Sequence, residues 1–198
     1  ETTAAPNDPL FSAQWALKNT GQNQGTAGID INYLPAREVT QGSSDIIVAV
    51  LDHGTQLDHP DLNVSSKSYD TETGRSPSQI WGNHGTACSG IISAKTNNNL
   101  GVAGIAPNCP VMSISNQLMG TSDAPQKRAD GFNWAWRNGA SVISNSWRSS
   151  TFSELLEDAI QSAMTNGRNG LGCVVTFSAG NYDSNTVGYP ARSLPDII

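Results

Sequence analysis

The sequence predicts an α/β domain, a doubly wound and mostly parallel β-sheet with helices on both faces. Three observations support this fold class. Short apolar runs rich in Val and Ile recur along the chain, predicted helices separate these runs, and the two kinds of element alternate throughout. Because successive parallel strands must be joined by crossovers, such alternation is typical of an open sheet with helices packed on each side.

The predicted strands cover residues 46–51, 111–115, 142–145 and 173–178. The first of them is a continuous run of six apolar residues, which is typical of a strand buried on both faces. Residues 1–44 contain Pro and Gly with little hydrophobic periodicity, so we expect an irregular N-terminal arm with one short helix at 34–39. Residues 45–198 then form the α/β core.

Three helices are expected within the core. Residues 84–94 are rich in small side chains, which is typical of a tightly packed helix. Residues 130–138 stop before Gly139, and glycine is favoured just beyond a helix C-terminus. Residues 151–165 open with Thr-Phe-Ser-Glu, a capping-box pattern that would make Thr151 the N-cap.

Composition narrows the classes of function. The chain has 198 residues, 37% of them hydrophobic, and 11 Lys and Arg against 17 Asp and Glu give a net charge of −6. Nucleic-acid binding needs clustered basic residues, and a membrane helix needs about 20 successive apolar residues. We therefore expect no nucleic-acid partner and no membrane segment. Many Ser, Asn and Gly residues and a start unlike a leader favour a mature protein that is secreted, cell-surface or periplasmic.

Three cysteines, Cys88, Cys109 and Cys173, cannot all pair within one chain. Cys109 and Cys173 each stand just before a predicted strand, where a small buried thiol is the expected state. No pair of Cys and His residues has the spacing of a zinc site, so we expect none of that kind.

Polar residues follow the predicted strands at the place where such sheets bind ligands, outside the carboxyl ends of the strands. Asp52 follows the first strand, Asn145 ends the third, and Asn181 follows the fourth. His84 begins the helix that crosses over from the first strand, so it starts from the same edge. A carboxylate, an imidazole and an amide are therefore expected to meet there.

These groups suit acyl transfer. A carboxylate beside an imidazole fixes its tautomer and stabilises the imidazolium, so that the other ring nitrogen takes a proton from a nucleophile. An amide directed at the developing oxyanion contributes about 3–4 kcal/mol of transition-state stabilisation. Each of Asp52, His84 and Asn181, taken alone, also has a non-catalytic interpretation, because such residues are common in turns and at helix N-termini. The hypothesis depends on their convergence.

Two other motifs leave alternatives open. Residues 58–61, Asp-His-Pro-Asp, suit either a transition-metal site or a turn, and the Pro-Asp-Leu continuation favours the turn. Residues 101–104, Gly-Val-Ala-Gly, are a weak match to a dinucleotide-binding fingerprint, because no acidic residue ends a second strand.

Four segments resemble, in order, the motifs of the subtilisin-like serine proteases, or subtilases. The aspartate, histidine, substrate-binding and oxyanion segments of that family correspond to residues 48–62, 83–90, 142–147 and 177–181. Asp before His is also the chain order in subtilisin. The kexin-like branch and its secreted bacterial relatives are most similar, because Cys88 follows the histidine by four residues as it does in that branch.

The resemblance implies a role for each residue at this edge. Asp52 would orient the imidazole, His84 would act as general base and then general acid, and Asn181 would stabilise the oxyanion. Polypeptide substrates would lie along Ser146, Trp147, Arg148, Ser178, Ala179 and Gly180. The family usually has glycine where this chain has Arg148, so the arginine either narrows the substrate pocket or points outward to meet acidic substrates.

Residues 97–104 resemble the calcium-binding loop of the same branch. The resemblance implies a structural Ca²⁺ ion bound by the side chains of Asp8, Asp61 and Asn98 and by the backbone carbonyls of Lys95, Leu100 and Val102. Carboxylate, amide and carbonyl oxygens are the ligands that Ca²⁺ prefers. Such a site would hold the N-terminal arm against the core, although an Asn-rich turn also forms without an ion.

The nucleophile of the family is the serine of a Gly-Thr-Ser-x-Ala-x-Pro segment beyond the oxyanion asparagine. Residues 120–125, Gly-Thr-Ser-Asp-Ala-Pro, lack one position and precede that asparagine, and Ser184 and Ser193 lack the motif. We therefore expect residues 1–198 to be the N-terminal portion of a single catalytic domain, truncated at its C-terminal end and inactive alone. Its partners would be its own propeptide and C-terminal portion. The alternative is a non-catalytic relative with a peptide-binding or structural role.

Overall fold

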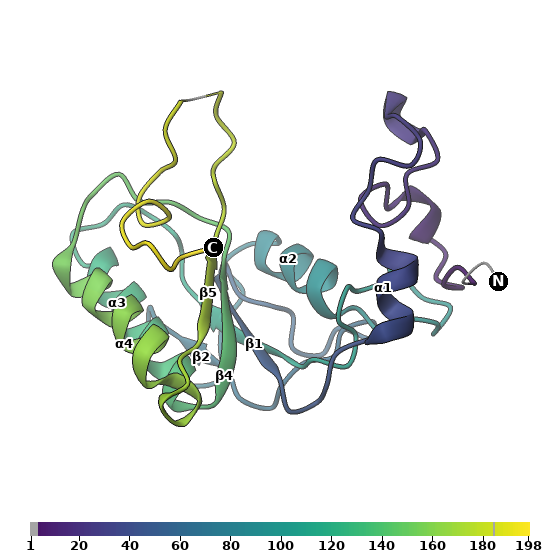
Figure 1. Cartoon of the computed structure of the whole chain (residues 1–198). Helices are drawn as coiled ribbons and strands as arrows, with labels where there is room; N and C mark the ends of the chain where they lie inside the picture. Colours follow the sequence, from purple (N-terminus) through teal and green to yellow (C-terminus); the bar gives the residue numbers. More distant parts are fainter. Residues whose placement is uncertain (1–3, 184) are drawn as a thin grey trace.

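The computed structural model describes residues 4–183 and 185–198, and a five-stranded sheet lies at its centre (Figure 1). All five strands are parallel, in the order β2-β3-β1-β4-β5. The strands are β1 (Ile47–Asp52), β2 (Tyr69–Asp70), β3 (Val111–Ser115), β4 (Ala140–Asn145) and β5 (Val174–Phe177). The continuous apolar run forms the central strand β1, as its expected burial on both faces requires.

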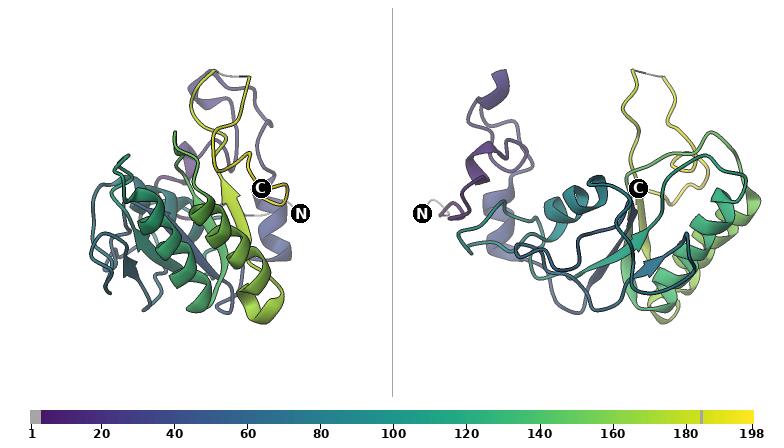
Figure 2. Two further views of the ribbon diagram at one scale, coloured as in Figure 1. Left: turned by 90° about the vertical axis from the view of Figure 1, so that its left-hand side faces the viewer. Right: turned by 180° about the vertical axis from the view of Figure 1, so that it is seen from behind.

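Helices cover both faces of the sheet, and the predicted α/β fold is confirmed. The helices are α1 (Tyr33–Val39), α2 (His84–Ser93), α3 (Ala124–Arg137) and α4 (Glu154–Gly170), with 3-10 turns at Phe11–Ala13 and Gln22–Gln24. Helices α3 and α4 pack side by side on one face, and α2 lies on the other (Figures 1 and 2). No helix in the described part of the chain is both long and apolar enough to cross a membrane.

The main hydrophobic core lies between the sheet and the α3–α4 pair. Leu51, Ile114 and Ile143 project from three adjacent strands and are fully buried. They share one core cluster with Phe132 of α3 and Ile160 of α4. Burial of each such side chain contributes about 1.5–3 kcal/mol, so this layer fixes the sheet on which the polar edge is built.

The N-terminal arm has a small core of its own. Phe11, Leu17 and Tyr33 pack around Ala103, which belongs to the loop after α2. The hydroxyl of Tyr33 also donates a hydrogen bond to the carbonyl of Gly104 at 3.0 Å. The arm therefore docks on the 97–104 loop. The division into an arm at 1–44 and a core at 45–198 stays a prediction.

Strand β2 and the beginning of α3 differ from the sequence prediction. Strand β2 has two residues, one of them the charged Asp70, so it carries no apolar run that a pattern search detects. Helix α3 begins at Ala124 rather than at residue 130. Pro125 stands in its first turn, where the missing N–H of proline removes no helical hydrogen bond.

The N-cap of α4 also differs from the prediction. Ser153, and not Thr151, caps the helix, because the hydroxyl of Ser153 accepts the backbone N–H of Leu156 at 3.3 Å. The Glu of the Thr-Phe-Ser-Glu pattern is therefore the first helical residue rather than the third.

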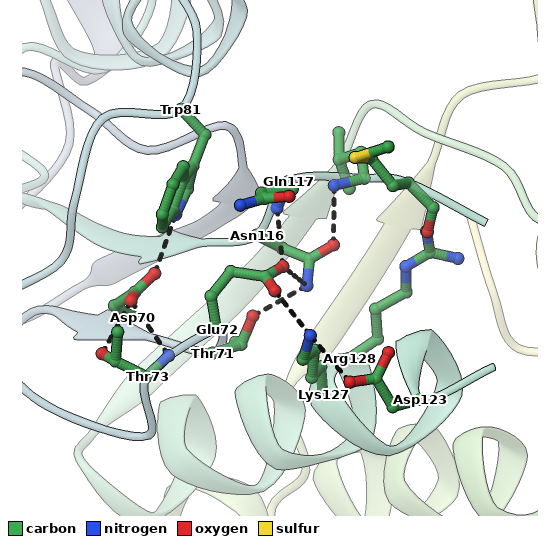
Figure 3. Close-up of polar contacts among 12 residues, drawn as sticks. Asp70, Thr71, Glu72, Thr73, Trp81, Asn116, Gln117, Asp123, Lys127 and Arg128 are labelled. Carbon is green, nitrogen blue, oxygen red and sulfur yellow. Dashed lines mark hydrogen bonds and ion pairs between the residues drawn. The ribbon is translucent and has the colours of Figure 1, made fainter. Parts of the chain in front are cut away.

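A buried carboxylate at the end of β2 connects several segments near the carboxyl edge of the sheet (Figure 3). Asp70 accepts hydrogen bonds from Trp81 Nε1 at 2.9 Å, from Ser115 Oγ at 2.8 Å and from Thr73 Oγ1 at 2.7 Å. Burial acts to raise the pKa of Asp70, but these hydrogen bonds outweigh it and hold the pKa below its usual value. The backbone N–H of Trp81 donates to the carbonyl of His53 at 2.7 Å, so the network reaches the segment that follows β1.

We expect Asp70→Asn to lower the free energy of unfolding by about 1–3 kcal/mol at neutral pH, because an amide faces donors with its own N–H groups. A lowered folded-state pKa stabilises the protein above the unfolded value of about 3.9, and this contribution is lost as the pH falls toward the folded value. The difference between wild type and variant in urea unfolding should therefore shrink between pH 7 and pH 3. Asp45→Asn, at an exposed acid, is the control. A difference that stays constant down to pH 3 would contradict the role of the charge.

Candidate active site

Asp52 is the last residue of the central strand, and its side chain is completely buried. Its Oδ1 atom accepts the backbone N–H of His53 at 2.7 Å. Both carboxylate oxygens lie 2.9 Å from Nδ1 of His84. Because a buried charge is unfavourable unless it is paired and hydrogen-bonded, these contacts explain how the sheet accommodates a carboxylate here.

His84 is the first residue of α2, and its side chain is about half exposed, at 52%. A carboxylate accepts hydrogen bonds and cannot donate them, so the contact with Asp52 places the ring proton on Nδ1. The other ring nitrogen, Nε2, is then an acceptor. The pair has the arrangement that allows an imidazole to remove a proton from a nucleophile.

Backbone packing holds the beginning of α2 against the segment after β1. A Cβ atom on Gly85 would collide with the backbone of Gly54, so the close approach requires glycine. One turn later, the buried hydroxyls of Thr55 and Ser89 lie 2.7 Å apart. The N–H of Thr55 donates to the hydroxyl of Ser113, on β3, at 2.9 Å. These contacts fix the position of the imidazole relative to the sheet.

Cys88 lies one turn along α2 from His84, with its Sγ atom 3.7 Å from Nδ1. Burial raises the pKa of the Cys88 thiol, so the thiol is neutral near pH 7. The ligand atoms of Asp52, His84 and Cys88 lie within 4.8 Å of one another. This cluster differs from the expectation that no Cys and His residues form a metal-type group. Because Nδ1 already faces the carboxylate, we interpret the group as a hydrogen-bonded pair beside a thiol. The thiols of Cys109 and Cys173 are free and buried, as predicted.

The segment after β4 directs alternate side chains inward and outward. Trp147 is buried, and its Nε1 donates to the carbonyl of Leu51 at 3.0 Å. Arg148 is exposed, with its guanidinium 4.0 Å from the centre of the Tyr182 ring. Ser146, just before Trp147, is half-buried. Arg148 also lines the cavity between residues 118–125 and 148–151, and its effect on substrate binding stays a prediction.

The predicted oxyanion segment, residues 177–181, begins with the buried last residue of β5, and its residues 178–181 are exposed at the same edge of the sheet. The N–H of Ser178 donates to the carbonyl of Asn145 at 3.0 Å, which ties the segment to the end of β4. Gly180 has φ of +102°, a left-handed conformation that favours glycine. The amide of Asn181 is exposed to solvent, and its role stays a prediction.

Two buried carboxylates, Asp8 and Asp61, lie at the predicted calcium loop. Asp8 accepts the backbone N–H groups of Asn97 and Asn98 at 3.0 and 3.1 Å. Asp61 accepts Nδ2 of Asn98 at 2.7 Å and the N–H of Val102 at 3.2 Å. In the part of the chain that the structure describes, neither carboxylate forms an ion pair. Two buried negative charges therefore lack a positive partner.

The surroundings of these carboxylates fit a cation. The backbone of Gly101 passes so close to Asp61 that a Cβ atom would collide with the carboxylate. Lys95 directs its ammonium to a backbone carbonyl, at 3.0 Å, rather than to Asp61. Oδ1 of Asn98 accepts the N–H of Leu100 at 2.9 Å, which shapes the turn. The two carboxylates suit Ca²⁺, whereas Asn98 faces Asp61 with its NH2 group and its oxygen accepts from Leu100, so Asn98 and the three carbonyl ligands stay predictions.

The remaining sequence motifs occupy turns and loops. Nδ1 of His59 accepts the N–H of Asp61 at 3.2 Å, as the turn interpretation of residues 58–61 requires. Ser122 is exposed just before α3, and the hydroxyl of Ser193 donates to the carbonyl of Pro190 at 2.8 Å. Ser184 lies outside the described residues.

The doubly wound sheet and the pairing of Asp52 with His84 at its carboxyl edge define a candidate hydrolase. Comparison with known families is more specific, because residues 43–195 match the model of the Subtilase family. The chain belongs to the subtilases, and the family prediction is confirmed.

Individual relatives agree with this assignment. The calcium-dependent protease of Nostoc sp. is 34% identical over 86% of this chain, and the thermophilic serine proteinase of Bacillus sp. is 35% identical over 95% of it. A solved protease structure from Pseudoalteromonas arctica has a TM-score of 0.71 and 30% identity, covering 90% of this chain and 60% of that one. This chain spans 28% and 46% of the length of the two relatives.

Because its pKa is raised, the Cys88 thiol should react slowly with iodoacetamide near pH 7. The rate should still be increasing with pH well above the usual thiol value of about 8.5. Peptide mapping by mass spectrometry of the folded and the urea-unfolded protein measures this rate. The buried Cys109 and Cys173 should label only after unfolding and serve as internal controls. Fast labelling of Cys88 in the folded protein at pH 7 would contradict the raised pKa.

Proposed function

We propose that the protein containing this chain is a serine-type endopeptidase of the subtilisin kind, with Asp52 and His84 as two members of its catalytic triad. The observation that carries this proposal is the 2.9 Å contact between the buried carboxylate and Nδ1 of the half-exposed imidazole. Subtilase family membership supports proteolysis, and a relative named a serine proteinase supports the class of nucleophile.

In the proposed mechanism, Nε2 of His84 takes the proton of a serine hydroxyl, whose oxygen attacks the scissile carbonyl of a bound polypeptide. The same nitrogen later gives the proton to the leaving amine. Asp52 holds Nδ1–H in position and stabilises the imidazolium without itself becoming protonated. Asn181 donates from its side-chain amide to the oxyanion of the tetrahedral intermediate.

The nucleophile is assigned to a part of the protein beyond these residues. The chain carries no Gly-Thr-Ser-x-Ala-x-Pro segment. We therefore take residues 1–198 as the N-terminal portion of the catalytic domain, inactive without its C-terminal portion. A propeptide is a second proposed partner, and secretion or a cell-surface or periplasmic location is the proposed setting. Substrate would lie along the segment after β4, with Ser146 and Arg148, and along residues 178–180.

One observation favours a second candidate, a non-catalytic subtilase that binds peptides or serves a structural role. It is Arg148, at a position where the family usually has glycine. This candidate retains the fold and the Asp52–His84 contact but has no nucleophile.

We also propose a structural Ca²⁺ ion between Asp8 and Asp61, with Asn98 as a further ligand. The uncompensated buried carboxylates support it, as does the relative named a calcium-dependent protease. Because Asp8 belongs to the arm and Asp61 to the core, the ion would join the two.

Labelling with a fluorophosphonate separates the two candidate functions. We expect the complete gene product to be labelled at a serine beyond residue 198, and the 198-residue chain to remain unlabelled. In the complete protein, His84→Ala should lower kcat by about 10⁴-fold or more with KM little changed, because the proton acceptor is lost. Asp58→Ala, which removes an exposed acid from the loop after β1, is the matched control. Label on neither protein, with normal circular dichroism, would favour the non-catalytic candidate.

Calcium removal tests the metal site. Because a ligand that binds only the folded state stabilises it, by about 4 kcal/mol at a thousandfold excess over Kd, EDTA should lower Tm. Asp61→Asn should lower Tm in calcium and make it insensitive to EDTA, whereas Asp45→Asn should keep the dependence of the unchanged protein. Identical melting curves in EDTA and in excess Ca²⁺ would count against the site.

A further inference from the structure

We propose that the cavity beside the Trp147–Arg148 segment recognises an acidic side chain of the bound peptide. This inference rests on the proposed peptide-binding function and adds the substrate feature that the site selects. The cavity has a volume of about 650 Å³ and lies between the loop at 118–125 and the segment at 148–151. It therefore opens beside the end of β4, along which the peptide is proposed to lie.

A buried arginine lines this cavity. Arg128, on α3, is 3% exposed, and its Nη2 donates to the carbonyl of Met119 at 3.1 Å (Figure 3). Its Nε atom is buried and has no hydrogen-bond partner among the described residues. The guanidinium lies 4.8 Å from the centre of the Trp147 ring, which fixes it next to the substrate segment. A buried cation with incomplete hydrogen bonding favours the arrival of an anion.

Burial lowers the pKa of Arg128 and the charge of nearby Glu72 acts against this, but no acidic group among the described residues pairs directly with the guanidinium. Glu72 and Asp123 are both paired with Lys127, at 2.7 and 2.8 Å (Figure 3). The N–H of Gln117 also donates to Glu72, at 2.9 Å. Among the described residues that line the cavity there is no Asp or Glu, although the whole chain has 17 of them. The positive charge of Arg128 is therefore left without a direct ion pair.

A second arginine lines the cavity from its exposed side. Arg148 stacks on the ring of Tyr182, and it also lines a smaller cavity of about 220 Å³ together with Arg192. Hydroxyl groups complete the lining of the larger cavity, from Thr121, Ser122, Ser149, Ser150 and Thr151. Guanidinium groups bind carboxylates through two parallel N–H bonds, and hydroxyls add further donors. This donor-rich lining fits the carboxylate of Glu or Asp better than an amide or an ammonium group.

The test uses the complete gene product and fluorescein-labelled alanine peptides in which Glu, Gln or Lys replaces each position in turn. Fluorescence anisotropy in a His84→Ala background, which prevents cleavage, gives Kd, and mass spectrometry of the products formed with His84 intact gives kcat/KM. At one position we expect Glu to be favoured over Gln by at least about tenfold. The ratio should fall to about one in Arg128→Met and in Arg148→Gln, stay intermediate in Arg128→Lys, and invert toward Lys in Arg148→Glu.

Arg137→Gln, an exposed arginine at the other end of α3, is the matched control and should keep the full ratio. If circular dichroism shows that Arg128→Met does not fold, Arg128→Lys and the Arg148 variants carry the test. A ratio near one at every position of the unchanged protein would overturn the inference, as would a full ratio in Arg148→Gln. Fluorophosphonate labelling without any preference for Glu would overturn this inference alone. A Glu preference in binding without labelling would support it for a non-catalytic protein.

Discussion

A carboxylate buried at the end of the central strand has to be compensated, and the carboxyl edge of this structure is arranged around that requirement. Asp52 receives a backbone N–H from the next residue and the Nδ1–H of His84. To bring the imidazole there, α2 must begin against the segment that leaves β1. Gly85 allows this approach, because a Cβ atom there would collide with the backbone of Gly54. The electrostatic requirement of one residue thus determines where a helix begins.

The same strand end is tied to every neighbouring segment through its backbone. The three successive carbonyls at 51–53 accept hydrogen bonds from Trp147 Nε1 at 3.0 Å, from the Asn116 N–H at 2.8 Å and from the Trp81 N–H at 2.7 Å. These donors follow β4, β3 and β2 respectively. The edge therefore behaves as one rigid support, and a side chain placed on it has little freedom to move away from its partner.

Sequence reasoning succeeded where the signal is local and failed where it depends on assembly. The apolar runs locate four of the five strands, and parallel topology alone then places Asp52 and His84 at one edge. Strand β2 was not predicted, because two residues are too few to show a hydrophobic period. The role of its Asp70 becomes visible only in the folded structure, where hydrogen-bond donors surround the carboxylate. Arg128 has no sequence signature, because its burial depends on the Met119 carbonyl and the Trp147 ring, which only the folded chain brings to it.

The order of the strands also has a consequence for how the chain reaches this structure. Val48 of β1 pairs with Val111 on one side and with Val142 on the other. Strand β1 is synthesised before both of these neighbours, so it cannot pair until β3 and β4 have also been synthesised. Loops must close before such distant pairings form, which makes folding slow for this kind of topology. During that time the apolar residues 46–51 stay open to association with other chains, with only the charges of Asp45 and Asp52 at their two ends to oppose it. The strand that carries the candidate catalytic aspartate is thus also a segment open to misassembly, and protecting it early would affect the yield of folded protein more than its final stability.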